Sequence, residues 1–282
     1  MSSLTGHQMT KNLDAETVKS FGDEGSRFDQ SELSADEAIK IFDEYFAVFP
    51  WDRLSDSATR FDMGCGTGRW AKRIAPRVGH LHCIDPSSAF DVVRAAIAFG
   101  ANVTFHCASV DESPFPLGSQ DFGYSLGVLH HVPNTSSDIR AGVAMLKLGA
   151  PFKFYLYYAF DNRSLLFRLT WRCSDLLRRA VCKLPSKLKH MAIEVLARLV
   201  FYPMVRLSLF VGSMGCNLAS ITLTYYRNHS FYTMRTDSRD SFGMPLEQCF
   251  TRKEIASMLG AAGLADVYFS ELAPHWRAVD SK

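Results

Sequence analysis

The chain lacks a strong excess of charge of either sign. Its 282 residues carry 31 Lys and Arg against 29 Asp and Glu, which gives a formal net charge of +2 at pH 7. A general nucleic-acid binder normally carries a clear basic excess, so that class is not favoured. With 47% hydrophobic and 21% charged residues, the composition is typical of a globular protein and excludes a disordered or collagen-like chain.

Cysteine spacing excludes two further classes of protein. Seven cysteines stand at positions 65, 83, 107, 173, 182, 216 and 249, and no two have the Cys-x-x-Cys spacing or the Cys/His rhythm of a zinc site. The sequence therefore predicts no metal site, and the odd number excludes a complete intramolecular disulfide framework. Residues 1–20 lack the apolar core of a signal peptide, so we expect a cytoplasmic protein.

Short apolar runs alternate with helical segments through the first half of the chain. The runs stand at 60–63, 81–84, 103–107, 122–126 and 152–157, and two more near the end stand at 265–272 and 276–280. Helices are expected near 69–78, 88–99 and 136–147. This β-α-β-α order predicts a parallel sheet with helices on both faces. The last two strands should pair antiparallel, because no crossover helix fits between them.

Two capping boxes mark helix starts outside this alternation. Ser34 and Glu37 have the spacing of a box before an expected helix at 34–48. Thr251 and Glu254 have the same spacing before a helix that should end just before Gly263.

The sharpest pattern is a glycine loop after the first apolar run. Asp62-Met63-Gly64-Cys65-Gly66-Thr67-Gly68 lets the backbone approach a ligand closely and leads into a helix N-terminus. A dinucleotide fold would need a further glycine where Arg69 stands. Asp62 would repel a pyrophosphate but suits an ammonium, and Asp85, which ends the next strand, suits ribose hydroxyls. A ligand with a nucleoside at one end and an amino acid at the other describes S-adenosylmethionine.

Four motifs in this order resemble those of class I methyltransferases. They are Asp-Met-Gly-Cys-Gly-Thr-Gly at 62–68, Cys-Ile-Asp-Pro-Ser at 83–87, Ser-Pro-Phe-Pro-Leu-Gly-Ser-Gln-Asp-Phe at 113–122 and Ser-Leu-Gly-Val-Leu-His-His-Val at 125–132. The likeness covers about residues 59–157 and is nearest to the small-molecule branch called methyltransferase type 11. It implies a Rossmann-like α/β fold whose seven-stranded, mostly parallel sheet has one antiparallel strand. It also implies S-adenosylmethionine as the cofactor and S-adenosylhomocysteine as the product.

The resemblance implies a set of cofactor-binding residues. They are Asp62, Gly64, Cys65, Gly66, Gly68, Asp85, Pro86, Ser109, Val110, Asp111, Leu126 and Gly127. Many relatives have an aspartate at the position of Ser109 that accepts from the adenine amino group. Adenine recognition is therefore expected from the Ser109 hydroxyl, the Val110 N–H or Asp111. Leu126 and Gly127 would lie beside the sulfonium.

His130 and His131 are the candidate catalytic residues. They follow the fourth strand, where the family's methyl donor faces the acceptor. Methyl transfer needs mainly in-line positioning and exclusion of water, and a base only when the acceptor is protonated at neutral pH. Histidine suits that role. The two side chains could instead cap the next helix or pack, and the sequence does not choose between them.

Residues 160–235 interrupt the alternation with a basic helical insertion. Ten Lys or Arg stand between Arg163 and Arg206 against the two acids Asp175 and Glu194, a local excess of +8 that leaves −6 for the rest of the chain. Residues 207–226 carry no charge, but their hydroxyl and amide groups make them too polar for a transmembrane span. Three interpretations stay open: a solvated lid, a lid that receives an acidic or lipophilic acceptor, and a peripheral membrane contact.

These patterns divide the chain into four parts. They are an N-terminal segment over the cofactor (1–58), the cofactor-binding core (59–159), the basic insertion or lid (160–240), and a C-terminal helix and strands that complete the core (241–282). In the family, insertions after the fifth strand often build the acceptor pocket. The pocket candidates are Tyr157, Tyr158, Tyr226, Tyr232, Arg235 and Arg239. Phe21-Gly22 and Arg27-Phe28 are expected to close over the cofactor.

The sequence thus predicts an enzyme that transfers a methyl group to a small or medium organic acceptor of metabolite or natural-product type. One alternative is an RNA-modifying methyltransferase, suggested by the basic insertion. RNA recognition needs base-stacking aromatics interleaved with phosphate contacts. The basic residues here lie largely on amphipathic helices, so nucleic acid is not the expected partner. Another alternative is a non-catalytic protein with this fold. The acceptor atom and the oligomeric state are not determined by the sequence.

Overall fold

The central element of the computed structural model is one sheet with the strand order β3-β2-β1-β4-β5-β7-β6. The structure describes residues 12–25, 32–53, 55–87, 101–112, 115–215, 223–265, 267–270 and 277–282. The strands are β1 Thr59–Met63, β2 His80–Ile84, β3 Val103–His106, β4 Phe122–Leu126, β5 Pro151–Tyr155, β6 Tyr268–Phe269 and β7 Arg277–Ser281. Strands β1 to β5 are parallel, and β7 runs antiparallel to β5 and β6. The predicted seven-stranded sheet with one reversed strand is confirmed.

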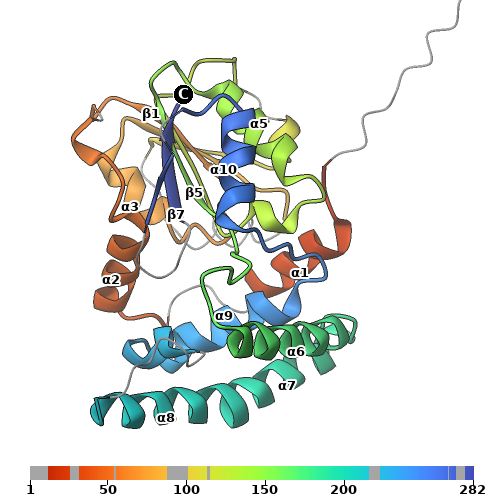
Figure 1. Cartoon of the computed structure of the whole chain (residues 1–282). Coiled ribbons are helices and arrows are strands. Elements are labelled where there is room, and N and C mark those ends of the chain that lie inside the picture. The colour runs from red at the N-terminus through yellow and green to blue at the C-terminus, as the bar shows by residue number, and fades with distance from the viewer. Residues whose placement is uncertain are drawn as a thin grey trace, which may run out of the picture.

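Helices cover both faces of this sheet (Figure 1). Those of the core are α1 Ala15–Gly25, α2 Ala35–Phe46, α3 Ala71–Ile74, α5 Thr135–Met145 and α10 Arg252–Ala261. The helix expected at 69–78 is α3 followed by a 3₁₀ turn, Ala75–Arg77, which contains a proline. The helix expected at 88–99 lies outside the described residues.

Two apolar clusters, one on each face, hold the core together. On one face Phe61, Met63 and Phe152 pack among buried residues of α5 and α10. On the other face Phe122 and Tyr124 pack among buried residues of α2 and α3. Burial on both faces is the reason why these parallel strands are continuous apolar runs in the sequence.

The two capping boxes differ. Thr251 and Glu254 form the complete reciprocal box at the start of α10, as predicted. Ser34 caps α2 by accepting from the Glu37 N–H, but the Glu37 carboxylate turns elsewhere. It accepts from the Ser230 N–H at 2.7 Å and from the Thr233 hydroxyl at 2.8 Å. Glu37 therefore joins α2 to a helix almost two hundred residues away instead of closing its own box.

A separate layer of helices, here called the lid, lies between β5 and α10 in the chain. Its helices are α6 Leu165–Val181, α7 Ser186–Leu196, α8 Tyr202–Ser213 and α9 Phe231–Gly243. In Figure 1, α9 lies between the sheet and the layer of α6 to α8. The lid is helical, as expected, and its last helix runs to Gly243, a few residues past the expected boundary at 240.

The longest helix of the lid is apolar. A π-helical turn, Ala197–Phe201, joins α7 to α8, so that Ser186–Ser213 forms one helix of 28 residues. Its most apolar stretch of 18 residues has a mean hydropathy of 1.6 and is 17% buried. By length and composition, the helix is long and apolar enough to cross a membrane. Among the described residues it is the one helix with this property. It ends within the uncharged stretch at 207–226, of which residues 216–222 lie outside the described part.

Candidate active site

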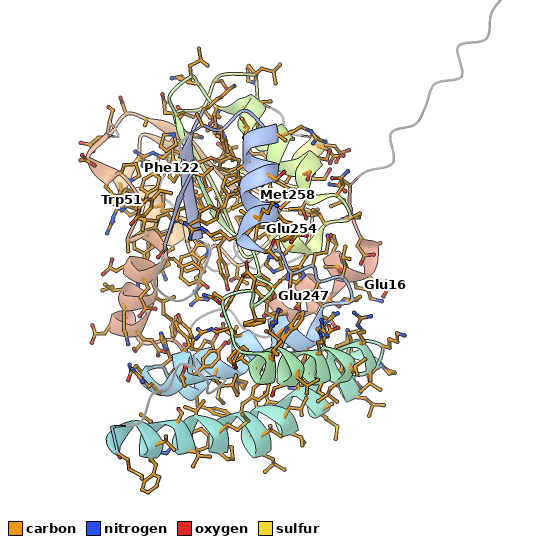
Figure 2. All side chains as sticks on the ribbon, in the orientation of Figure 1. Glu16, Trp51, Phe122, Glu247, Glu254 and Met258 are labelled. Carbon is orange, nitrogen blue, oxygen red and sulfur yellow. The ribbon has the colours of Figure 1, made fainter. Side chains whose placement is uncertain are left out.

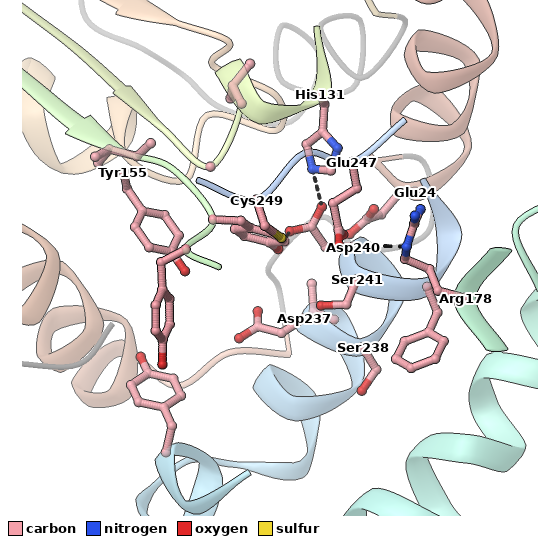
Figure 3. Close-up of a pocket in the computed structure, with 18 of the residues that line it drawn as sticks. Glu24, His131, Tyr155, Arg178, Asp237, Ser238, Asp240, Ser241, Glu247 and Cys249 are labelled. Carbon is pink, nitrogen blue, oxygen red and sulfur yellow. Dashed lines mark hydrogen bonds and ion pairs between the residues drawn. The ribbon is translucent and has the colours of Figure 1, made fainter. Parts of the chain in front are cut away.

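A cavity of about 1200 Å³ lies at the carboxyl ends of β1, β2, β4 and β5. In open parallel sheets this edge is where ligands bind. Helix α1 and the lid helices α6, α8 and α9 supply the opposite wall. Figure 3 shows part of that wall, with Asp237 and Asp240 of α9 on one side of the space and Tyr155 at the end of β5 on the other. The cavity therefore joins the core to the lid.

Seven of the predicted cofactor residues line this cavity. They are Gly64, Cys65, Gly66, Asp85, Pro86, Leu126 and Gly127. Gly64 and Gly66 have φ values of +83° and +49°, in the left-handed region that favours glycine. A Cβ on Gly64 would lie 2.4 Å from a methyl of Val128, whereas a Cβ on Gly66 would meet no atom within 4 Å. The loop is closed on its inner side and leaves open space on the side of the cavity.

Asp85 is held rigidly beside the loop. One carboxylate oxygen accepts from the Gly66 N–H at 2.7 Å. The other accepts from the Ser87 N–H at 2.8 Å and from its hydroxyl at 2.5 Å. Burial raises the pKa of Asp85, and these three hydrogen bonds oppose that shift. The carboxylate is fixed where the sequence analysis expects ribose hydroxyls.

Asp62 does not line the cavity. It is 1% exposed, and one of its oxygens accepts from the Tyr124 hydroxyl at 2.8 Å. Burial raises the pKa of Asp62 to about 8, although the Tyr124 hydrogen bond lowers it. The Asp62 side chain is thus largely protonated at neutral pH. It is buried beneath the glycine loop, where it bonds to Tyr124 of β4. Direct contact with a ligand ammonium, as the sequence analysis expects, does not fit this placement. Gly68 also lies outside the lining residues.

The residues expected at the adenine are not on the wall either. The Ser109 hydroxyl, 2% exposed, donates to the Glu112 carboxylate at 2.9 Å. Asp111 accepts from the Asn12 N–H at 3.2 Å, and Val110 packs in the apolar core. Within the described part of the chain, residues 109–111 do not line the cavity.

The two histidines have different surroundings. His130 is fully buried away from the cavity and stacks on the Tyr157 ring, with centroids 3.8 Å apart. Burial lowers the pKa of His130 well below its ordinary value, so the ring is neutral. His131 lines the cavity, and its Nδ1 donates to the Leu246 carbonyl at 2.6 Å. Of the two histidines, His131 alone remains a candidate general base, because an acceptor in the cavity cannot reach His130.

His131 is paired with a carboxylate that the sequence analysis does not assign. Its Nε2 lies 3.5 Å from Asp240 of α9, and Figure 3 shows the two side chains directed at each other. Burial alone lowers the pKa of His131, but Asp240, the Leu246 carbonyl and Glu247 raise it above its ordinary value. The Tyr157 hydroxyl donates to the second oxygen of Asp240. Asp240 is therefore held between Tyr157 and His131.

Further carboxylates stand on the same wall, and most of them escaped the sequence analysis. They include Glu24 of α1, Asp175 of α6, Asp237 and Asp240 of α9, and Glu247 after α9. Burial raises the pKa of Asp237 to about 6 and that of Glu247 to about 7. Burial, and then Asp240, raise the pKa of Glu24 well above its ordinary value. The spacing of three between Asp237 and Asp240 puts both on one helix face, which is the signal that could have found them.

Glu247 has an incomplete set of partners. Its side chain is 9% exposed, and Arg178 Nε lies 3.8 Å from Oε1. Its other oxygen, Oε2, is buried without a hydrogen-bond partner. A buried carboxylate oxygen in this condition costs free energy unless a ligand satisfies it.

The predicted acceptor residues divide into two groups. Tyr157, Tyr158 and Tyr226 line the cavity, together with Tyr155 and Tyr225, which the sequence analysis left unassigned. The other three lie outside the lining residues: Tyr232 is 8% exposed, Arg235 pairs with Glu32 at 3.2 Å, and Arg239 contacts His190.

The N-terminal segment takes the expected position in part. Phe21 and Gly25 of α1 line the cavity, and the Phe21 ring lies edge-on to the His131 ring, with centroids 5.1 Å apart. The predicted Arg27-Phe28 pair lies outside the described residues.

Comparison with known proteins bears on the core. Residues 61–149 match the family model described as "Methyltransferase domain". An S-adenosylmethionine-dependent methyltransferase from Mesorhizobium loti is similar in structure, with 16% identity, a TM-score of 0.51, and 85% of this chain and 97% of that chain covered. A protein from Methanococcus maripaludis has 12% identity, a TM-score of 0.52 and 97% coverage of both chains. No curated protein sequence matches this chain.

A third similar structure is longer than this chain. It is phosphoethanolamine N-methyltransferase 2 from Haemonchus contortus, in complex with phosphomonomethylethanolamine and S-adenosylhomocysteine. The identity is 14% and the TM-score 0.50, and the match covers 90% of this chain but 44% of that one. This chain therefore spans less than half of that protein. At such identities these likenesses show the fold.

Proposed function

We propose that this chain is a class I, S-adenosylmethionine-dependent methyltransferase that methylates the amine nitrogen of a small or medium organic acceptor. The match of residues 61–149 to the family model described as "Methyltransferase domain" supports the methyl transfer. The observation that carries the proposal is the shared cavity. It places the glycine loop and Asp85 on one wall and a group of carboxylates that includes Asp237, Asp240 and Glu247 on the other. The first wall suits the cofactor, and the second suits an acceptor that bears a positive charge.

The residues on the sheet side fit the cofactor. Asp85, fixed by Gly66 and Ser87, would accept from the ribose hydroxyls. The open space beside Gly66 would receive the amino-acid part, and Leu126 and Gly127 would lie beside the sulfonium. When bound, S-adenosylmethionine supplies an electrophilic methyl group.

The electrostatics of the lid side favour a cationic acceptor. Asp237, Asp240 and Glu247 would attract an ammonium group. Arginine side chains line the cavity as well, and of these Arg178 is paired with Asp175 at 2.8 Å. The aromatic rings of Tyr155 and Tyr157 border the same space and add favourable faces for a cation. The same carboxylates would repel the phosphates of an RNA substrate.

An ammonium nitrogen has no lone pair, so a proton must leave before the nitrogen can attack the methyl group. Glu247 suits this step because its pKa is about 7 and its Oε2 has no other hydrogen-bond partner. Asp240 would bind the ammonium. His131 donates to Leu246 through Nδ1 and faces Asp240 with Nε2, so it is a positioning residue that holds the Asp240 carboxylate in place. In this proposal His131 takes that role in place of the general base considered from the sequence.

The experiment measures methyl transfer from isotopically labelled S-adenosylmethionine to matched acceptors. Each set consists of an amine, an alcohol and a carboxylic acid on the same carbon skeleton. We expect the amines to be methylated and the alcohols and acids to remain unmodified. Methylation confined to the alcohols or acids would overturn the amine assignment. Calorimetric titration with S-adenosylhomocysteine tests the cofactor site separately, and absence of binding would overturn the enzyme proposal itself.

A further inference from the structure

We propose that the outer face of the lid, formed by α6 and by the helix Ser186–Ser213, docks on the surface of an anionic lipid membrane. This inference goes beyond methyl transfer and stands on a different part of the molecule. It rests on the distribution of exposed apolar side chains, on the charge around them and on the position of the cavity mouth.

Exposed large apolar side chains are concentrated on the lid. Of the 18 in the described part of the chain, 14 lie between Leu165 and Met214. Single exposed apolar residues are ordinary on a protein surface, but a concentration of this kind marks an interaction site. Figure 2 shows side chains that project from the lid layer on the side away from the sheet.

The long helix presents these residues as one stripe. The stripe consists of Leu188, Met191, Val195, Leu199, Pro203, Leu207, Phe210 and Met214, all exposed. Each step along it is three or four residues, which is the spacing of one helix face. Leu199 is 72% exposed and Phe210 64%. The opposite face, with Ile193, Ala197 and Val205, is buried in the lid.

Because the face opposite the stripe is packed against the rest of the lid, the helix does not span a membrane in this structure. Ala197 and Val205 pack with Met234 of α9, and Lys189 donates to the Gly243 carbonyl at 3.1 Å. A helix held along its length by α9 can lie flat on a membrane without leaving the protein. Its apolar stripe then reaches the boundary between headgroups and acyl chains, as in interfacial amphipathic helices.

The charge around the stripe favours an anionic lipid surface as the binding partner of this face. Residues 163–206 carry an excess of +8, and Arg172, Lys183, Lys187 and Arg206 are exposed. Long basic side chains beside an apolar face reach lipid phosphates while their stems cover apolar surface. A second copy of the chain is disfavoured, because a twofold contact would bring the same basic surface against itself.

The cavity opens beside this face. Leu177 of α6 and Val200 of the π turn line the cavity and are also 43% and 41% exposed. Leu177 and Val200 therefore belong both to the cavity lining and to the exposed apolar residues of the lid. If the proposed amine methylation is correct, an amphiphilic amine could enter from the bilayer by this path; the docking itself does not depend on that.

The experiment is flotation of the full-length protein with phosphatidylcholine vesicles that contain or lack phosphatidylserine, at low and at high salt. We expect binding to the anionic vesicles that weakens with salt and about fivefold with each basic residue removed, in the series Lys183→Gln, Lys187→Gln and Arg206→Gln. The double variant Leu199→Glu/Phe210→Glu should lose binding by at least tenfold.

Matched controls keep the test decisive. Leu117→Glu and Leu148→Glu alter side chains that are 79% and 88% exposed but lie outside the lid, and both variants should bind like the unaltered protein. Unchanged circular dichroism and S-adenosylhomocysteine affinity would show that the lid variants are folded.

Three results would overturn the proposal. The first is absence of binding to anionic vesicles at low salt, and the second is equal binding by the double variant. The third is a dimer of the unaltered protein, measured by light scattering, that is absent in the double variant; the face would then join two copies of the chain.

Discussion

The core and the lid bury their apolar residues in opposite ways. All five residues of β4 are buried, and Phe122, Phe152 and Phe154 are fully enclosed. In the lid, the stripe from Leu188 to Met214 is exposed along its whole length. The core therefore has the pattern of a domain stabilised by its own packing. The lid has the pattern of a surface that is completed by something else.

The same division holds for chemistry. The core supplies the glycine loop and Asp85, whose positions follow from strand ends and local turns. The lid side supplies Asp237, Asp240 and Glu247, and burial among distant segments raises the pKa values of Asp237 and Glu247. The predictions below separate these contributions.

The largest expected effect compares one buried and one exposed apolar side chain. Phe152→Ala should lower the free energy of unfolding by about 3–5 kcal/mol, because it leaves a cavity in a packed core. Leu199→Ala should change it by less than about 0.5 kcal/mol, because the side chain is 72% exposed. Urea unfolding measures both. A large loss from Leu199→Ala would mean that the stripe is covered within the protein.

Glu247→Gln tests whether the lid carries the acid–base chemistry. It removes the proposed proton acceptor, and we expect kcat for an amine acceptor to fall by about 100-fold or more, with S-adenosylhomocysteine affinity unchanged. Initial rates and calorimetry measure the two quantities. Glu16→Gln, on the exposed side of α1, is the control and should leave both unchanged. Full activity of Glu247→Gln would remove it from the mechanism.

Gly64→Ala tests the core in the same way. The new Cβ would combine a left-handed φ with a 2.4 Å approach to Val128, so we expect cofactor affinity to fall about 10- to 100-fold. Gly149→Ala has a similar φ of +78° but meets no atom within 4 Å, and it lies outside the cavity lining. Calorimetry should therefore show ordinary cofactor binding for Gly149→Ala. Equal effects of the two variants would mean that the loop does not approach the cofactor.

The smallest expected effect is a dependence of stability on pH. Burial raises the pKa of Glu247 from 4.5 to about 7, so between these values the folded chain holds a proton that the unfolded chain has released. Stability should therefore fall as pH rises through this window, by roughly 2 kcal/mol for this group. The raised pKa of His131 acts in the same direction, since its contribution is lost as pH rises through the folded value.

Thermal unfolding without ligand, between pH 5 and pH 8, measures this effect. The Glu247→Gln variant should show a weaker decline over the range, and the Glu16→Gln control should decline as the unaltered protein does. An undiminished decline in Glu247→Gln would contradict the assignment of the shift to Glu247.

Much of the fold was predictable because it depends on local pattern. Buried parallel strands are short apolar runs, and the Thr251 box closes within one turn of helix. At Ser34 one of the two hydrogen bonds of the predicted capping box is absent. The Glu37 carboxylate accepts from Ser230 and Thr233 instead of from the backbone N–H of Ser34. A capping motif is local, but its glutamate is free to bond elsewhere.

The candidate site was predictable only on the side built from strand ends. Gly64, Asp85 and Gly127 reach the cavity because each directly follows a strand, and Gly66 lies in the loop that Gly64 begins. The identities of Arg235 and Arg239 suggested a pocket, but the packing of α9 directs them elsewhere.

By itself, the sequence determined where the core strands lie along the chain, the glycine loop and the basic, helical character of the lid, because short-range periodicity and turn chemistry carry that information. Tertiary structure alone decided that Asp62 and His130 are buried away from the cavity and that Glu247 and Asp240 face it. It also decided which side of the helix Ser186–Ser213 remains exposed. The burial, ionisation and exposure of a side chain depend on contacts between segments that are far apart in the chain. A local sequence pattern does not show which of these segments come into contact.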